Sequence, residues 1–303
     1  MYQIQASIVM LYPSKFALIA TLLLGVGDLA ASSPVPRKAS PCRTLSRQTH
    51  KLKSSVLNSD APLAPRGGGP KASTASSKSI SISTKTAVLC GCALAFNSGF
   101  VNGACLSGIL SSTKQAAAAV TGAWTNSALG VASGNYDQAK FNAKCLGSYF
   151  LGSLVASLIN PNPVPFEVGG ADKISPAFLI GSLLMYASSS VAKKSGGSDK
   201  AFIYLAAVAC GIQNSITSVL TQNLVRSAHF SGITSDIGTF LGQVLRGNKQ
   251  NAEKLRVFTL LAASFWIGGL VSFSATTTYA SSSLLFSSAL FLAFSIAGLV
   301  AAC

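Results

Sequence analysis

The chain has 303 residues, of which 49% are hydrophobic and only 10% are charged. Soluble domains carry about 25% charged residues, so the composition indicates a membrane protein. The net charge of +15 does not indicate a nucleic-acid-binding protein, because basic and aromatic residues do not alternate along the chain. Basic loops beside a lipid bilayer explain the charge better.

The first segment of the chain resembles a targeting sequence. Lys15 precedes the apolar run 16–26, and the small residues 30–32 follow it, as in a secretory signal peptide. Residues 33–85 are rich in Ser, Lys, Arg and Pro and nearly free of acidic residues, as transit peptides are. The two segments together resemble the bipartite presequence of algae with complex plastids. The alternative is a signal peptide followed by a disordered basic tail, which would place the protein in a plasma membrane or endomembrane.

Apolar segments fill the chain after residue 85, and each is about long enough to cross a bilayer. We expect an all-α polytopic bundle with eight spans, at residues 86–110, 115–133, 141–159, 175–192, 201–220, 229–245, 257–274 and 281–303. The second and sixth segments are the most polar. If they are re-entrant instead, six spans remain.

The loop charges favour eight spans. In that arrangement nine Lys and Arg residues lie in loops on the side of the N-terminal tail and three on the opposite side, as the positive-inside rule requires. Six spans divide the same charges equally. The eight-span model places Ser198 and Asn248 on the same face of the membrane.

The sequence contains a weak internal repeat with a period of about 112 residues. The run from Gly99 to Gly103 corresponds to the run 211–215, and Thr121-Gly122 corresponds to Ser231-Gly232. Four spans in each half would make two parallel repeats, residues 86–192 and 201–303. Three spans in each half would make the repeats inverted.

Small residues recur every four positions in several segments, which allows close approach of membrane helices. We expect five glycines to pack helices together: Gly99, Gly103, Gly211, Gly238 and Gly242.

Three runs of the sequence carry a family resemblance: Gly211 to Gln213-Asn214, Arg226 to Gly238, and Leu245 to Gly247. With them the chain resembles the YoaK-type family of bacterial multi-pass membrane proteins, whose function is unassigned. The family pattern is roughly G-x-Q-N-A followed by R-T-T-H-V-T-G-x-x-T-D-x-G. The chain differs at Ser227-Ala228, Ala123 and Asn102, where the family has Thr-Thr, Asn and Asp. The resemblance implies a membrane fold and a shared polar core, but no known activity.

Asp236 is the only acidic residue inside the apolar segments. An ionised carboxylate in the middle of a spanning helix costs about 2.5–3.5 kcal/mol, so it usually faces the bundle interior or a wet cavity. We therefore predict a polar site for a solute, cation or proton, formed by Asp236, His229, Ser231, Thr234, Gln213, Asn214, Asn102, Thr121 and Asn126.

Three functions are compatible with this pattern. The first is a transporter or channel-like protein for a small solute. The second is a scaffold, assembly factor or lipid-binding subunit in which Asp236 and His229 form an interhelical clasp. The third is an intramembrane enzyme, which we do not expect because the spans contain no catalytic motif. We expect no cofactor and no nucleic-acid partner. Because the seven cysteines are scattered, we also expect no metal site.

Overall fold

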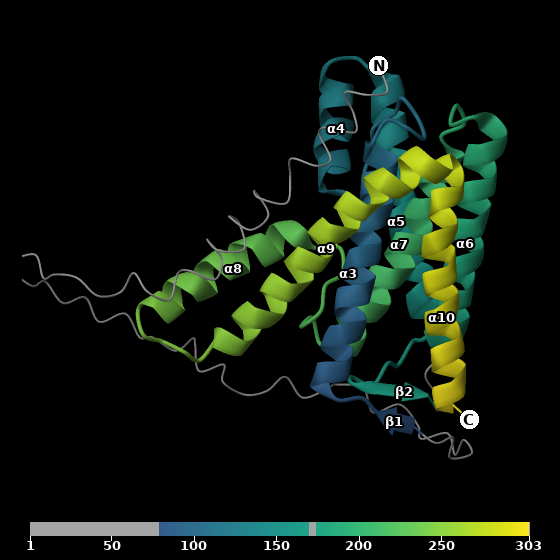
Figure 1. Cartoon of the computed structure of the whole chain (residues 1–303). Coiled ribbons are helices and arrows are strands. Elements are labelled where there is room, and N and C mark those ends of the chain that lie inside the picture. The colour runs from purple at the N-terminus through teal and green to yellow at the C-terminus, as the bar shows by residue number, and fades with distance from the viewer. Residues whose placement is uncertain (1–78, 170–173, 303) are drawn as a thin grey trace, which may run out of the picture. The chain divides into compact units, whose positions relative to one another are not determined.

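The computed structural model describes residues 79–169 and 174–302, which belong to one unit of the chain, residues 71–303. Of the targeting segments predicted for residues 1–32 and 33–85, residues 1–78 lie outside the described residues. The described elements are, in chain order, β1 (Ser79–Ser81), α3 (Thr84–Leu106), α4 (Thr121–Ala132), α5 (Tyr136–Ile159), β2 (Glu167–Gly169), α6 (Ile174–Ser195), α7 (Ala201–Leu220), α8 (Phe230–Leu245), α9 (Ala252–Tyr279), η2 (Ala280–Ser283) and α10 (Leu284–Ala302) (Figure 1).

The expected all-α class is confirmed, with one small addition. Strands β1 and β2 form a two-stranded antiparallel sheet in which Ile80 pairs with Val168. Residues 79–85, expected to belong to the disordered tail, form β1 and the start of α3. The side chain of Ser83 accepts a hydrogen bond from the backbone N–H of Thr86, which caps the first turn of α3.

The described residues include helical stretches that are long and apolar enough to cross a bilayer. Four stretches meet this description: Thr84–Leu106, Ile174–Ser195, Ala201–Leu220 and the stretch Ala252–Val300, which contains α9 and α10. Many large apolar side chains on these stretches are exposed, among them Leu89, Leu183 and Val300. Exposed apolar side chains on long apolar helices are what a lipid environment requires. The protein is therefore an integral membrane protein.

Helices α4 and α8 are only about half as long as the helices that follow them. They have 12 and 16 residues, whereas α5 and α9 have 24 and 28. At 1.5 Å per residue, α4 and α8 cover about 18 and 24 Å, less than the roughly 30 Å of a hydrocarbon core. Of the predicted second and sixth segments, 115–133 and 229–245, only the parts within α4 and α8 are helical.

Helix α8 runs antiparallel to α9 from the middle of α9 toward its start. At the N-terminal end of α8, the rings of Phe230 and Phe265 are 3.9 Å apart. At the other end, Asn251 donates a hydrogen bond of 2.8 Å from Nδ2 to Gln243 Oε1. Phe265 is the midpoint of α9, so α8 begins beside that midpoint and ends beside the first residues of α9.

Two helix pairs, α3 with α9 and α5 with α7, are packed through glycine. A Cβ atom on Gly99 would lie 1.9 Å from the carbonyl oxygen of Phe265, and one on Gly211 would lie 2.2 Å from that of Tyr149. A Cβ on Gly103 would lie 1.9 Å from Ser272 Oγ. Gly99 and Gly211 therefore lie where the backbones approach too closely for any side chain, and Gly103 lies against the hydroxyl group of Ser272.

The contacts of these two pairs are equivalent. A Cβ on Gly152 in α5 would lie 2.0 Å from the carbonyl oxygen of Val208 and 3.0 Å from the backbone nitrogen of Ile212. A Cβ on Gly268 in α9 would lie 2.1 and 3.0 Å from the same atoms of Phe96 and Phe100. Phe96 and Phe100 each precede their counterparts by the 112 residues of the sequence period. The third helix of each half thus packs on the first helix of the other.

The last helices of the two halves, α6 and α10, are joined by paired serines. Ser175 and Ser295 each donate from Oγ to the other's carbonyl oxygen, at 2.7 and 2.9 Å. Ser182 and Ser288 do the same, both at 2.9 Å. Residue numbers rise along α6 from Ser175 to Ser182, while the residue numbers of their partners in α10 fall from 295 to 288. Helices α6 and α10 are therefore antiparallel. Parallel repeats require these two helices to be parallel, so the expected parallel arrangement is wrong.

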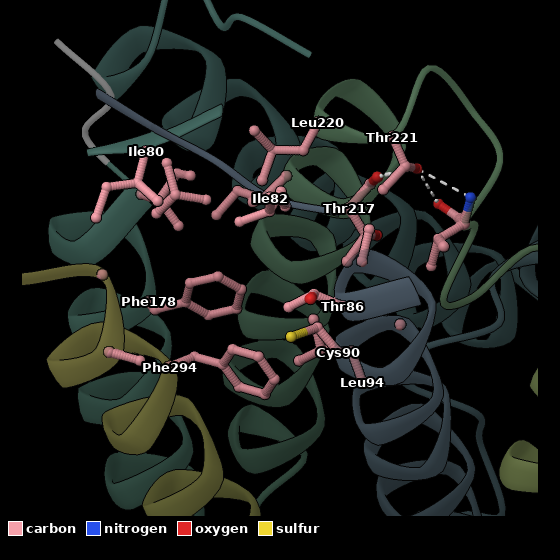
Figure 2. Close-up of a pocket in the computed structure, with 18 residues that line it drawn as sticks. Ile80, Ile82, Thr86, Cys90, Leu94, Phe178, Thr217, Leu220, Thr221 and Phe294 are labelled. Carbon is pink, nitrogen blue, oxygen red and sulfur yellow. Dashed lines mark hydrogen bonds between the residues drawn. The ribbon is translucent and has the colours of Figure 1, made fainter. Parts of the chain in front are cut away.

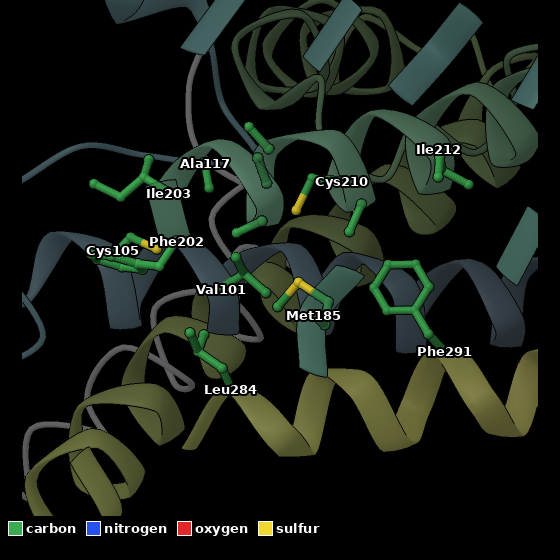
Figure 3. Packing of buried hydrophobic residues seen from close by; sticks show 14 of the residues in the cluster. Val101, Cys105, Ala117, Met185, Phe202, Ile203, Cys210, Ile212, Leu284 and Phe291 are labelled. Atoms are coloured by element: carbon green, nitrogen blue, oxygen red, sulfur yellow. The ribbon is translucent and has the colours of Figure 1, made fainter. Parts of the chain in front are cut away.

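The largest buried apolar cluster lies between α3, α5, α6, α7 and α10. It contains small and sulfur-containing side chains, and Figure 3 shows Val101, Met185 and Cys210 close together within it. A second cluster joins α8 to α9 and includes Ile233, Phe258 and Leu261. This second cluster holds the half-length helix α8 against the long helix α9.

Candidate functional site

A fully buried polar network lies between α3 and α7 and centres on Gln213. Gln213 Oε1 accepts a hydrogen bond of 2.8 Å from Asn97 Nδ2. Gln213 Nε2 donates to the carbonyl oxygen of Leu94 and to Ser98 Oγ, both at 2.8 Å, and to Ser227 Oγ at 3.1 Å. Asn97, Ser98, Gln213 and Ser227 are all completely buried. The network joins the first helices of the two halves to the segment that precedes α8.

The polar partners of Gln213 were missed in the sequence. Asn97 lies in the apolar run 93–101, so the reasoning that singled out Asp236 applies to it as well. Its signal in the sequence is weaker than that of Asp236 because its side chain is neutral. The Oδ1 atom of Asn97 is buried and has no hydrogen-bond partner, so the network retains one free acceptor.

Asn102 and Asn214, which the sequence repeat pairs, make the same kind of contact. Asn102 Oδ1 accepts a 2.7 Å hydrogen bond from the backbone N–H of Ala118, just before α4. Asn214 Oδ1 accepts a 3.2 Å hydrogen bond from the backbone N–H of Ala228, just before α8. Each asparagine holds the chain against its helix at the point where the half-length helix is about to begin. Their observed contacts are with the backbone of these two segments.

Asp236 lines a cavity of about 400 Å³ between α8, the start of α9 and the segment 221–226. The basic side chains of Arg226 and Lys254 line the same cavity, together with the rings of Phe166, Phe240 and Phe258. Among the described residues, Asp236 has no ion-pair partner within 4.0 Å. The Nε atom of Arg226 is buried and has no hydrogen-bond partner. The cavity is therefore lined by one acidic and two basic side chains.

The structure does not gather all the predicted site residues at one place. His229, Ser231, Thr234 and Thr121 are exposed, and Asn126 and Asp236 are half-buried. In the described part of the chain α4 packs along α5 and α8 packs along α9, so Asn126 and Asp236 lie on separate helix pairs. Thr234 Oγ1 donates to the carbonyl oxygen of Phe230 within its own helix.

Two of the five glycines expected to pack helices, Gly238 and Gly242, have no packing partner in the described structure, so that expectation is wrong for them. A Cβ on Gly238 or Gly242 would have no described atom within 4 Å, so these two glycines lie on an open face of α8. Gly232 differs, because its Cβ would lie 2.4 Å from Nε2 of His229. The imidazole of His229 is folded back over Gly232 of its own segment, and no hydrogen bond or ion pair joins it to another helix within residues 79–169 and 174–302.

A family model matches residues 90–297, described as "Protein of unknown function (DUF1275)". The chain belongs to the DUF1275 family. No curated protein and no solved structure matches it. The DUF1275 match includes the Gln213 network, both half-length helices and the cavity at Asp236. It begins within α3 and so excludes β1.

Proposed function

We propose that this DUF1275 protein is a transporter or channel-like protein for a small solute, with six spanning helices in two inverted repeats. In this proposal α3, α5, α6, α7, α9 and α10 cross the bilayer, whereas α4 and α8 enter it only to about its middle. The observation that carries the proposal is the antiparallel direction of α6 and α10, which their serine pairs establish. The last helices of two repeats run in opposite directions when the repeats are inverted, an arrangement found in several transporter families.

The half-length helices support the same conclusion. Inverted-repeat transporters bind solutes near the bilayer midplane, where discontinuous helices begin. Helix α8 begins beside Phe265, the midpoint of α9. The start of a helix has unpaired backbone N–H groups and carries a partial positive charge of about half an elementary charge. Helices α4 and α8 would bring two such ends into the bilayer from opposite faces.

We place the solute in the cavity at Asp236. Two basic residues, Arg226 and Lys254, line it against one acid, so the cavity favours a solute with an anionic group. The buried Nε of Arg226 is available to donate to such a group. Asp236 would take up a proton or hold a cationic group of the same solute. Because the apolar segments carry no recognised catalytic motif, we also propose that the protein is not an enzyme.

A second candidate function is a non-transporting scaffold or lipid-binding subunit. The Gln213 network favours it, because four buried side chains from α3, α7 and segment 221–229 hold the halves together. In this alternative the clasp is formed by Gln213 and Asn97. The pair first considered, Asp236 and His229, would have no such role.

We also propose that the protein is similar to YoaK-type bacterial proteins in particular, and that its N-terminal segment directs it to a plastid. A fluorescent fusion of the full chain tests the targeting. Fluorescence in the plastid envelope or thylakoid would support it, and fluorescence in a plasma membrane or endomembrane would contradict it.

Thermal unfolding of the purified protein with a panel of carboxylates, phosphates, amino acids and cations tests the solute site. A ligand at about 100 times its dissociation constant adds roughly 2.7 kcal/mol of stability, which is enough to detect. We expect an anionic or zwitterionic solute to stabilise the wild type and Asp137→Asn equally. Asp137 is exposed in the first turn of α5 and does not line the cavity, so it is a matched control. Asp236→Asn should insert normally and lose this stabilisation. If no solute acts, or the shift survives in Asp236→Asn, the proposed site is wrong.

A further inference from the structure

A second cavity, of about 240 Å³, lies among α3, α6, α7 and α10 at the end of the bundle covered by β1 and β2. Figure 2 shows Phe178 and Phe294 on one side of it and Thr86, Cys90 and Leu94 on the other. The cavity lies between two helix pairs that are each closely packed, α3 with α9 and α6 with α10. It does not include Asp236, Arg226 or Lys254.

The hydroxyl groups that line the cavity all have hydrogen-bond partners already. Its hydroxyl groups belong to three threonines, and each already has a partner. Thr86 Oγ1 lies 2.9 Å from Ser83 Oγ. Thr217 Oγ1 and Thr221 Oγ1 donate to the backbone oxygens of Gln213 and Thr217 at 3.1 and 2.7 Å. A buried water needs two to four polar partners, so this cavity favours an apolar occupant.

The dimensions of the cavity fit a hydrocarbon chain. An apolar cavity of about 150 Å³ holds benzene and stays dry, so this larger cavity has room for a longer apolar group. Its lining on α3 runs from Thr86 to Leu94, which is about 12 Å of helix. The surrounding helices α3, α6, α7 and α10 lie within the apolar stretches, so lipid chains are the apolar groups present at high concentration around them.

We propose that this cavity is a specific binding site for one acyl chain. The proposal does not depend on the transport of a solute. The thiol of Cys90 borders the cavity, so a larger side chain at this position would occupy the same space as the chain. Leu89 is the neighbouring residue, is 71% exposed and does not line the cavity, which makes it a matched control position.

Photo-crosslinking of the full chain in phosphatidylcholine vesicles tests the site. One arm uses phosphatidylcholine with a diazirine at the end of one acyl chain, and the other uses a diazirine fatty acid. We expect saturable labelling of peptides containing residues 86–94 and 294–298 in at least one arm. The labelling ratio of the two arms then distinguishes a phospholipid chain from a free fatty acid.

Cys90→Phe should reduce this labelling by about tenfold, which corresponds to roughly 1.4 kcal/mol of lost binding, whereas Leu89→Phe should leave it unchanged. Labelling that is non-saturable in both arms and spread evenly over exposed positions such as Leu285 and Leu299 would overturn the proposal. So would undiminished labelling in a folded Cys90→Phe variant. If that variant does not fold, the saturation and location of wild-type labelling decide the matter.

Discussion

At the scale of single residues, Gln213 has four hydrogen-bond partners for its side chain. It accepts from Asn97 and donates to three oxygens, from Leu94, Ser98 and Ser227, although its amide has only two hydrogens to share. A polar group buried without such partners costs about 1–3 kcal/mol, so the network is stable only when its members are present together. Gln213 therefore fixes how α3, α7 and segment 221–229 meet.

Replacing Gln213 by Leu should destabilise the protein by about 2 kcal/mol, because hydrogen bonds between membrane helices average about 0.6 kcal/mol and the amide makes three at a time, two donated and one accepted. Unfolding of the reconstituted protein measures this. Gln243→Leu, which removes one hydrogen bond to Asn251 at a less buried position, should cost about 0.6 kcal/mol or less. Adding Asn97→Leu to Gln213→Leu should cost less than the sum of the two single changes, because both partners are then apolar. Equal losses in Gln213→Leu and Gln243→Leu would contradict the account.

At the scale of elements, the close helix contacts are made by glycine and serine. The pairs α3–α9 and α5–α7 meet at glycines, and α6–α10 meets at serines that bond to the opposite backbone. Such contacts suit a membrane, where apolar side chains gain little by leaving lipid and close backbone packing supplies the attraction. The two glycine pairs have equivalent geometry, so equivalent substitutions in them should have similar effects.

Two neighbouring glycines of α5 test this packing. Gly152→Ala should cost about 1–3 kcal/mol, because its Cβ would lie 2.0 Å from the carbonyl oxygen of Val208. Gly147→Ala, on the same helix with no atom within 4 Å of its Cβ, should be neutral or about 1 kcal/mol more stable, because Ala favours helix. Thermal unfolding compares the two, and Gly268→Ala in α9 should match Gly152→Ala. A neutral Gly152→Ala would show that α5 and α7 do not meet at this glycine.

Much of this element-level arrangement is readable in the sequence. The long helices, the 112-residue period and three of the packing glycines follow from apolar length and small-residue spacing. The Asn97 network was not predicted, because a neutral amide in an apolar run gives a weaker signal than a charge. The sequence predicts spans at segments 115–133 and 229–245, where the structure has the half-length helices α4 and α8. Overall hydropathy does not distinguish a full span from a half-length helix preceded by an irregular segment.

At the scale of the whole molecule, the antiparallel direction of α6 and α10 changes the predicted topology. The charge count favoured eight spans because it treated the two most polar segments as crossings. With α4 and α8 re-entrant, the loop charges are balanced and no longer indicate an orientation. In the arrangement that we propose, the repeats are inverted and the two half-length helices approach the bilayer centre from opposite faces. The transport proposal rests on this geometry.

Labelling of single cysteines with a membrane-impermeant maleimide tests the central claim most directly. The three positions are Asn135, Ser198 and Asn248, introduced one at a time after replacement of the seven native cysteines. All three positions are exposed in loops between helices. The six-span account predicts that Asn135 and Ser198 are labelled from one face of the membrane and Asn248 only from the other. Labelling of all three from the same face would restore eight spans and contradict the inverted repeats.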